Sequence, residues 1–320
     1  MIARSLYYVN WWQVWCLVSG ANDLKAENPG VYRQLLESPH DDDIMESIDT
    51  DIPRTFPDNI YFRNDPEGKC KNLKNVLVAF AHYDKSVGYC QQQYGWVQGL
   101  NFITGMLLLV TENEENAFWL LVCLVQHILP PGYYTSSMSG LLMDIEVFSL
   151  LLHKDIRSLI DGEKKHWHQL SIDVSILWYW GNREGFNHPI LEVVQQQCLK
   201  WVLSRIKDPE VSEQLKKHDV PLNLVASKWF ICLYADVLPI ETLLRLWDCL
   251  FYEGSKVLFR AALCLVMVNR ERILAAKSFV EIVEIFKGIG RDIFPTYCHE
   301  FMKVSTLFTL SSVGPMWKLS

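Results

Sequence analysis

Apolar residues along most of the chain recur with the spacing of α-helices. In the segment 72–85 (NLKNVLVAFAHYDK), apolar side chains follow an i, i+3, i+4, i+7, i+8 pattern, which is typical of one buried helical face. Segment 240–254 shows similar spacing and ends in a glycine, while the apolar segment 115–129 ends at a Pro-Pro-Gly breaker. The same pattern predicts helices in four further segments, 143–153, 221–235, 256–274 and 278–288.

Two regions interrupt this helical pattern. Residues 40–59 are acidic and contain two prolines, so we expect most of this region to be a surface loop with Asp41–Asp43 in a solvated turn. Residues 157–203 contain an alternating segment, 172–178, of the kind that forms a strand. An isolated strand does not fit a helical chain, so the region 157–203 stands apart from its surroundings.

Composition narrows the class of protein. The chain has 320 residues, half of them hydrophobic, which is enough for one large core or two smaller ones. It carries 37 acidic and 30 basic residues, and the resulting net charge of −7 argues against a nucleic-acid binder, which usually needs a basic face.

Cysteine usage and hydropathy bear on the compartment. The 9 cysteines are mostly in apolar runs and include no C-x-x-C pair, which favours buried, reduced thiols of an intracellular protein. Apolar runs such as 102–110 are about half of the roughly 20 residues that a membrane-spanning helix needs. The N-terminal segment lacks the clean apolar stretch of a signal peptide. We therefore expect a soluble, cytoplasmic protein without a membrane span.

Conventional catalytic motifs are not prominent. His166 and His168 form the only close histidine pair, and no acidic or thiol side chain stands at ligand spacing, so a surface pair is favoured over a metal site. The sequence contains neither a G-x-x-x-x-G-K-[ST] nor a G-x-G-x-x-G motif, which indicates that the chain binds no nucleotide by itself.

The segment IDTDIPRT brings a cation into a restricted turn. Ile48, Asp51 and Arg54 are three residues apart, so Asp51 can reach Arg54 if the segment forms a helical turn. Pro53 restricts the backbone just before Arg54. Pro57 disfavours helical geometry at Phe56, the residue that precedes it. Taken alone, this arrangement is more often a local ion pair of small energetic consequence.

A second unusual stretch, GYCQQQYGWVQGLNF at 88–102, contains four glutamines. A primary amide donates and accepts hydrogen bonds at once, so a glutamine can hold a water molecule in a defined orientation. The residue types alone do not select one of the four.

Taken together, these segments resemble the TBC domain, the fold of the Rab GTPase-activating proteins. The resemblance covers most of the chain outside 157–203 and the two ends. It implies an all-α, multi-helix fold in a single domain at 1–304, an atypical insertion near 157–203 and a divergent tail at 305–320. The matching segments are IDTDIPRTFPDN, VGYCQ, QGLNF, FWLLVCLV, MSGLLMDIEVF, SKWFICLYADVLP and LLRLWDCLFYEGSKVLFRAAL.

The resemblance also implies a function. Members of this family act on a GTP-bound Rab GTPase and supply an arginine and a glutamine in trans, so the chain would be an activator and the hydrolase site would belong to its partner. Arg54 would be the arginine. GTP and Mg²⁺ would be carried by the partner, with no cofactor on this chain, and the partner would recruit the chain to endomembranes. The supporting positions are Ile48, Asp51, Thr55, Tyr89, Gly99 and Asn101.

The glutamine has two candidates because the family motif is interrupted here. Aligned on the preceding helix it is Gln91, and aligned on the following helix it is Gln98. We favour Gln98, because it is contiguous with the helix that would hold it. Two alternatives remain: a Rab-binding domain of the same fold without catalytic effect, and a chain whose insertions prevent stable folding.

Overall fold

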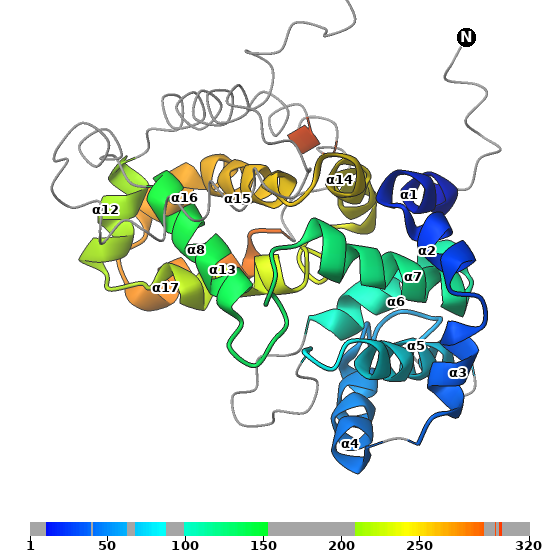
Figure 1. Ribbon diagram of the computed structural model, residues 1–320. Coiled ribbons are helices and arrows are strands. Elements are labelled where there is room, and N and C mark those ends of the chain that lie inside the picture. The colour runs from blue at the N-terminus through cyan, green and yellow to red at the C-terminus, as the bar shows by residue number, and fades with distance from the viewer. Residues whose placement is uncertain are drawn as a thin grey trace, which may run out of the picture.

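The structure is a computed structural model that describes residues 11–39, 41–62, 68–87, 99–152, 209–290, 298 and 301–302. Within these ranges every regular element is helical, which confirms the predicted all-α class (Figure 1). The elements are α1 Trp11–Ser19, α2 Ala21–Glu27, α3 Val31–Glu37, α4 Asp42–Asp51, the 3₁₀ turn η3 Ile52–Arg54, α5 Lys69–Tyr83, α6 Leu100–Thr111, α7 Glu114–Cys123, the π-helical turn η4 Leu124–Ile128, α8 Ser139–Leu152, α12 Pro209–Lys217, α13 Leu222–Ile231, α14 Ile240–Glu253, α15 Lys256–Val268, α16 Arg270–Ala275 and α17 Phe279–Gly288.

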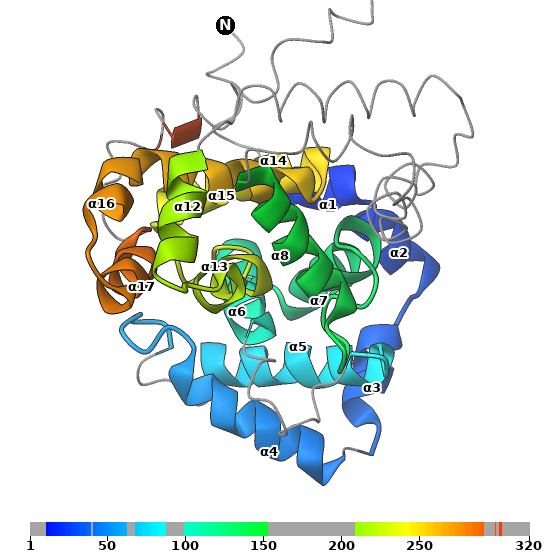
Figure 2. The ribbon, with the colours of Figure 1, turned by 90° about the vertical axis from the view of Figure 1, so that its left-hand side faces the viewer.

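Helices α6 and α7 lie in the middle of the molecule. Helix α5 packs against both, and α2 and α3 add to the same side (Figure 1). On the other side, α8 packs along α13, with α12, α16 and α17 around them (Figure 2). The candidate site residues therefore lie on an N-terminal group of helices that faces a C-terminal group across α6.

The first helix is tied to the C-terminal group by aromatic packing. The ring of Trp15 stacks on Phe251 at a centroid distance of 5.0 Å and lies 5.9 Å from Trp247. Its indole Nε1 donates a hydrogen bond of 2.8 Å to Asp248 Oδ1. Because such aromatic pairs add to the energy of burial, this cluster joins α1 to α14 firmly.

Residues 41–59 are mostly helical, so the surface loop predicted for 40–59 is wrong over these described residues. Asp41 is the N-cap of α4, and its side chain accepts a hydrogen bond of 3.0 Å from the backbone N of Asp43. Asp42 and Asp43 occupy the first turn, where carboxylates are stabilised by the helix dipole and by unpaired backbone N–H groups. The acidic run thus marks the start of a helix.

Two segments that are predicted to be single helices are not helical over their whole length. Segment 256–274 is divided at Asn269 into α15 and α16. Segment 221–235 is helical only to Ile231, because Leu233 and Tyr234 adopt positive φ angles of 45° and 65°. This early end leaves the buried carbonyl of Ile231 without an intrahelical partner.

Several predictions lie outside the described residues: the insertion 157–203 with its strand segment, the pair His166 and His168, and the tail 305–320. The domain limits stay a prediction. Among the described helices, none is both long and apolar enough to cross a bilayer.

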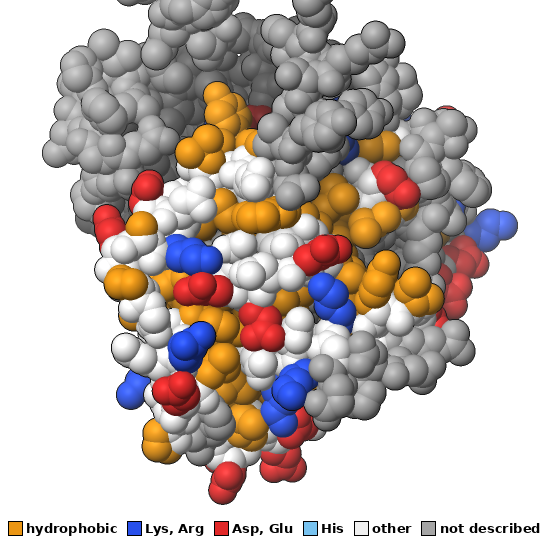
Figure 3. Space-filling view, turned by 90° about the vertical axis from the view of Figure 1, so that its right-hand side faces the viewer, with side chains coloured by type: hydrophobic (Ala, Val, Ile, Leu, Met, Phe, Trp, Pro, Cys, Tyr) orange, Lys and Arg blue, Asp and Glu red, His pale blue; other side chains and the backbone are white. Residues whose placement is uncertain are grey.

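On the face shown in Figure 3, acidic and basic side chains alternate among apolar ones. Salt screens exposed charges that are farther apart than a Debye length of about 10 Å, so these side chains act mainly on groups close to them.

Candidate functional site

Arg54 lies at the end of a short, well-defined turn. Helix α4 runs into η3 at Asp51, Pro53 lies in the first positions of that turn, and the backbone N of Thr55 closes it with a 3.0 Å hydrogen bond to Ile52 O. A proline at the start of a helical turn costs no hydrogen bond and fixes φ. The backbone that carries Arg54 is therefore restricted, as the sequence predicts.

The side chain of Arg54 is held at its base. Its Nε donates to Thr50 O at 3.2 Å, and its Nη2 forms an ion pair with Asp51 Oδ1, which confirms the predicted i, i+3 contact. The Arg54 side chain is 49% exposed, whereas that of Asp51 is 9% exposed. The guanidinium thus rests on a buried carboxylate and presents its other side to solvent.

Ile48 fixes the orientation of this pair. It is fully buried on the inner face of α4, one turn before Asp51. Because residues three apart lie on the same helical face, the burial of Ile48 directs Asp51 inward as well. The predicted supporting role of Ile48 is thus one of packing.

Thr55 and Asn101 connect the arginine turn to α6. The Thr55 hydroxyl donates to Asp51 O at 2.9 Å and accepts a 2.8 Å hydrogen bond from Asn101 Nδ2. Both side chains are buried. Two segments that are 46 residues apart in sequence are thereby joined, and the Asp51 backbone is anchored to the first turn of α6.

Gly99 is the N-cap of α6, and it lies against the end of α13. A β-carbon at this position would be 2.1 Å from the carbonyl oxygen of Ile231 and 2.7 Å from its carbonyl carbon. No real side chain tolerates such an approach to a backbone, so only glycine fits. Gly99 therefore lets the start of α6 rest directly on α13.

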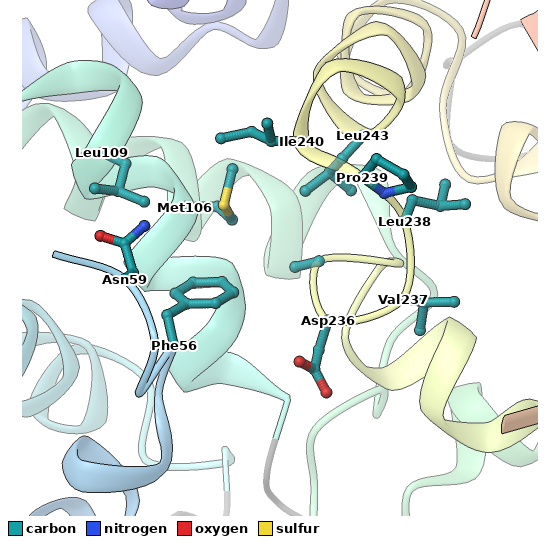
Figure 4. A pocket seen from close by; sticks show the side chains of 11 residues that line it. Phe56, Asn59, Met106, Leu109, Asp236, Val237, Leu238, Pro239, Ile240 and Leu243 are labelled. Carbon is teal, nitrogen blue, oxygen red and sulfur yellow. The ribbon is translucent and has the colours of Figure 1, made fainter. Parts of the chain in front are cut away.

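A hollow of about 520 Å³ opens beside the arginine turn (Figure 4). One wall comes from the loop after η3, a second from α6, and a third from the segment that leads into α14. Most of its lining is apolar. The lining residues are Phe56, Asn59, Met106, Leu109, Ala235, Asp236, Val237, Leu238, Pro239, Ile240 and Leu243.

Phe56 was not among the predicted site residues, although it lies only two positions after Arg54. Its φ angle is 48°, outside the right-handed helical region as the following proline predicts. Its ring lies 5.4 Å from that of Phe102, and a β-carbon at Gly105 would be 3.0 Å from it. The arginine turn and the hollow are thus parts of one surface.

Three predicted site residues, Tyr89, Gln91 and Gln98, lie outside the described residues, so the choice between the two glutamines stays a prediction. Within the described ranges there is no group of three or more His, Cys, Asp or Glu side chains placed to hold a metal ion.

The family and the fold are also found among known proteins. The sequence model of one protein family, the Rab-GTPase-TBC domain, matches residues 11–181 and 183–274 of this chain. The chain belongs to the Rab-GTPase-TBC domain family. The resemblance inferred from the sequence motifs is thereby confirmed.

Individual relatives agree with this membership. The TBC chain is 41% identical to growth hormone-regulated TBC protein 1-A of Danio rerio over 91% of its own length and 65% of the relative's. It is 33% identical to the GTPase-activating protein MSB4 of Saccharomyces cerevisiae over 82% of its own length. The chain spans about two thirds of the first relative and 48% of the second.

A solved structure supports the same fold. The crystal structure of the Chlamydomonas flagellar RabGAP TBC domain matches with a TM-score of 0.64 and 25% identity, over 92% of this chain and 78% of that one. The TBC architecture inferred from the sequence is therefore also found in three dimensions.

Proposed function

We propose that this TBC domain is a GTPase-activating protein for a Rab-family GTPase, and that it supplies Arg54 and Gln98 in trans to the GTP-bound partner. The observation that carries the proposal is the half-exposed Arg54 guanidinium on a rigid turn. Family membership supports a Rab as the partner, and the names of the relatives support GTPase activation.

The chemistry of GTP hydrolysis fits one exposed arginine. Phosphoryl transfer to water develops negative charge on the transferring group, and a positioned guanidinium stabilises that charge. An arginine supplied in trans raises the rate by roughly 10³ to 10⁵. Because the arginine must be preorganised, the anchoring of its turn through Thr55 and Asn101 supports this role.

Asp51 has a supporting part in this proposal. Its ion pair with Nη2 and the hydrogen bond from Nε to Thr50 O hold one side of the guanidinium. A guanidinium has five N–H donors, so the groups not engaged at its base remain for phosphate oxygens of the partner. Asp51 orients Arg54 and takes no part in the chemistry.

The glutamine is assigned to Gln98 on account of its direct bond to Gly99. Gly99 and Asn101 fix the start of α6, so a glutamine next to Gly99 begins from an anchored backbone. Gln91 lies seven residues earlier in the sequence. The active site, its GTP and its Mg²⁺ belong to the partner, and recruitment to endomembranes would occur through that partner.

The experiment is single-turnover GTP hydrolysis across a panel of Rab GTPases, with the wild-type chain and the variants Arg54→Ala, Gln98→Ala and Gln91→Ala. We expect at least one Rab to respond to wild type, with the response lost in Arg54→Ala and Gln98→Ala and retained in Gln91→Ala. Loss with Gln91→Ala alone would reassign the glutamine.

The alternative is a Rab-binding domain without GTPase activation. The interruption of the family motif between Gln91 and Gly99 favours it. This alternative predicts a Rab that binds the chain in its GTP form but hydrolyses its GTP at the same rate with wild type and with Arg54→Ala.

A further inference from the structure

We propose that Tyr134 is a positioning residue for the arginine turn, although it comes from the loop that precedes α8. The inference rests on the proposed GTPase-activating function. It follows from a continuous series of contacts, all among described residues, that links the Tyr134 hydroxyl to Arg54.

The first contact joins Tyr134 to the end of α13. Tyr134 is buried, and its hydroxyl donates a 2.7 Å hydrogen bond to the carbonyl oxygen of Ile231. Ile231 is the last residue of α13, where carbonyl groups lose their intrahelical partners. The next backbone N–H groups are used elsewhere, since that of Tyr234 donates to Trp229 O and that of Ala235 to Cys232 O. The phenol therefore satisfies a carbonyl that the end of the helix leaves open.

The second contact joins Ile231 to the start of α6. The carbonyl oxygen that accepts from Tyr134 is the same atom that a β-carbon on Gly99 would approach to 2.1 Å. Backbone thus lies on backbone at this point, with no side chain between them to absorb a displacement. The position of the Ile231 carbonyl sets the position of Gly99.

The third step runs from Gly99 to the arginine turn. Gly99 caps α6, and Asn101 in the first turn of α6 donates to Thr55, which donates to the backbone O of Asp51. Asp51 in turn pairs with Arg54. Tyr134 therefore bears on Arg54 through rigid, buried contacts.

Removal of the hydroxyl leaves the buried Ile231 carbonyl without that hydrogen bond. A buried backbone carbonyl that loses its partner favours any shift that restores one. A displacement of about 1 Å at a catalytic group can reduce the rate by roughly 10²-fold. Tyr134→Phe is expected to disturb the Arg54 turn while it preserves the packing of the ring.

The chain offers a matched control in the adjacent residue. Tyr133 is also buried, and its hydroxyl donates to the preceding carbonyl, that of Phe230, at 3.4 Å. The Phe230 carbonyl also accepts from the backbone N of Leu233 at 3.1 Å, and it is not the oxygen that faces Gly99. Tyr133→Phe therefore removes a buried hydroxyl without acting on the contact to α6.

The test compares the two variants in the full chain by single-turnover GTP hydrolysis on a responsive Rab, over a range of activator concentrations. We expect Tyr134→Phe to lower the maximal rate by roughly 10- to 100-fold with little change in the half-saturating concentration, and Tyr133→Phe to change it by less than about 3-fold. Equal rates for the two variants, or a change in the half-saturating concentration alone, would overturn the proposal.

Amide hydrogen exchange gives a readout that needs no GTPase. Tyr134→Phe should speed exchange at Ile103 and Thr55, whose backbone N–H groups donate to Gly99 O and Ile52 O, and Tyr133→Phe should leave those amides unchanged. If wild type activates no Rab, the proposed function fails, and the exchange result still decides the positioning role. Equal exchange in both variants contradicts the positioning role whatever the activity.

Discussion

Asp51 and Asp144 are two nearly buried carboxyl groups on different helices, α4 and α8, and their surroundings differ in one respect. Asp51 has the Arg54 guanidinium beside it. Asp144 is 2% exposed, and its Oδ2 has no hydrogen-bond partner among the described residues. Burial raises the pKa of Asp144 to about 8, an effect that the nearby Tyr133 hydroxyl partly offsets.

The comparison shows what a cation adds to a buried acid. Near Asp51 the chain keeps an ion pair at the surface, where the guanidinium remains open to a partner. Around Asp144 the surroundings favour the neutral form, which is the form that avoids an isolated buried charge. The two carboxyl groups lie on different helices, so each can be substituted while the other serves as a reference.

The largest expected effect comes from removal of the cation at the Asp51 side. Arg54→Ala should lower the activated rate of GTP hydrolysis by roughly 10³- to 10⁵-fold, because the transition-state charge loses its counter-ion. Single-turnover kinetics measure this effect. Thermal unfolding of the variant should remain cooperative, and collapse of that transition would show that the loss reflects misfolding.

The next effect concerns the acid that lacks a cation. The folded-state pKa of Asp144 lies above its ordinary value, so the native state holds a proton that the unfolded state releases. Its contribution to the free energy of unfolding is present below about pH 4. It declines as the pH rises toward about 8, by at most ~1.4 kcal/mol for each unit of pH.

Asp144→Asn should remove this pH dependence, because an amide of the same shape does not ionise. Chemical denaturation at several pH values between 4 and 9 measures the effect. The free energy of unfolding of the variant should equal that of wild type at low pH and exceed it increasingly toward pH 9. A difference that stays constant across this range would contradict the assignment.

Gly99→Ala tests the backbone contact between Gly99 of α6 and Ile231 of α13. The added β-carbon would overlap the Ile231 carbonyl, so we expect a loss of about 1–3 kcal/mol in the free energy of unfolding, together with lower activity. Denaturant titration measures the stability. Gly288→Ala is the control, since a β-carbon there would meet no atom within 4 Å. Equal free energies of unfolding for the two variants would show that the contact between Gly99 and Ile231 adjusts without loss of stability.

The smallest effect is expected for Asp51→Asn. Arg54 is half-exposed, so solvent screens much of the ion pair, and its loss should cost about 0.2–1 kcal/mol in the free energy of unfolding. The Thr55 contact to the Asp51 backbone remains available in this variant. Comparison by denaturation at low and high salt checks the prediction, since the difference between wild type and variant should shrink as salt rises.

The sequence predicts most of the helices because their apolar pattern is strong. The predicted segments 240–254 and 278–288 agree closely with α14 and α17. The sequence pattern does not single out helix α4, because its acidic start also fits a solvated turn, although a capping aspartate followed by carboxylates is equally typical of the start of a helix. The break at Asn269 does have a signal in the sequence, because the polar run Asn269–Arg272 interrupts the apolar pattern and asparagine is common at helix ends.

The candidate site divides in the same way. Asp51 and Arg54 are close in sequence, so their ion pair follows from spacing and a turn. The resemblance selected Thr55 and Asn101 but gave no contact between them, because that hydrogen bond depends on how α6 packs. The roles of Tyr134 and Phe56 could not be predicted, although Pro57 indicates the backbone geometry of Phe56, since they arise from a backbone approach and a hollow that only the folded chain forms.

Binding to a transition-state mimic tests the central claim most directly. The responsive Rab is loaded with GDP, and its affinity for wild type and for Arg54→Ala is measured with and without aluminium fluoride, which imitates the transferring phosphoryl group. We expect aluminium fluoride to strengthen binding of wild type by at least roughly 10²-fold and to leave binding of Arg54→Ala unchanged. Equal strengthening for both proteins would contradict an arginine supplied in trans.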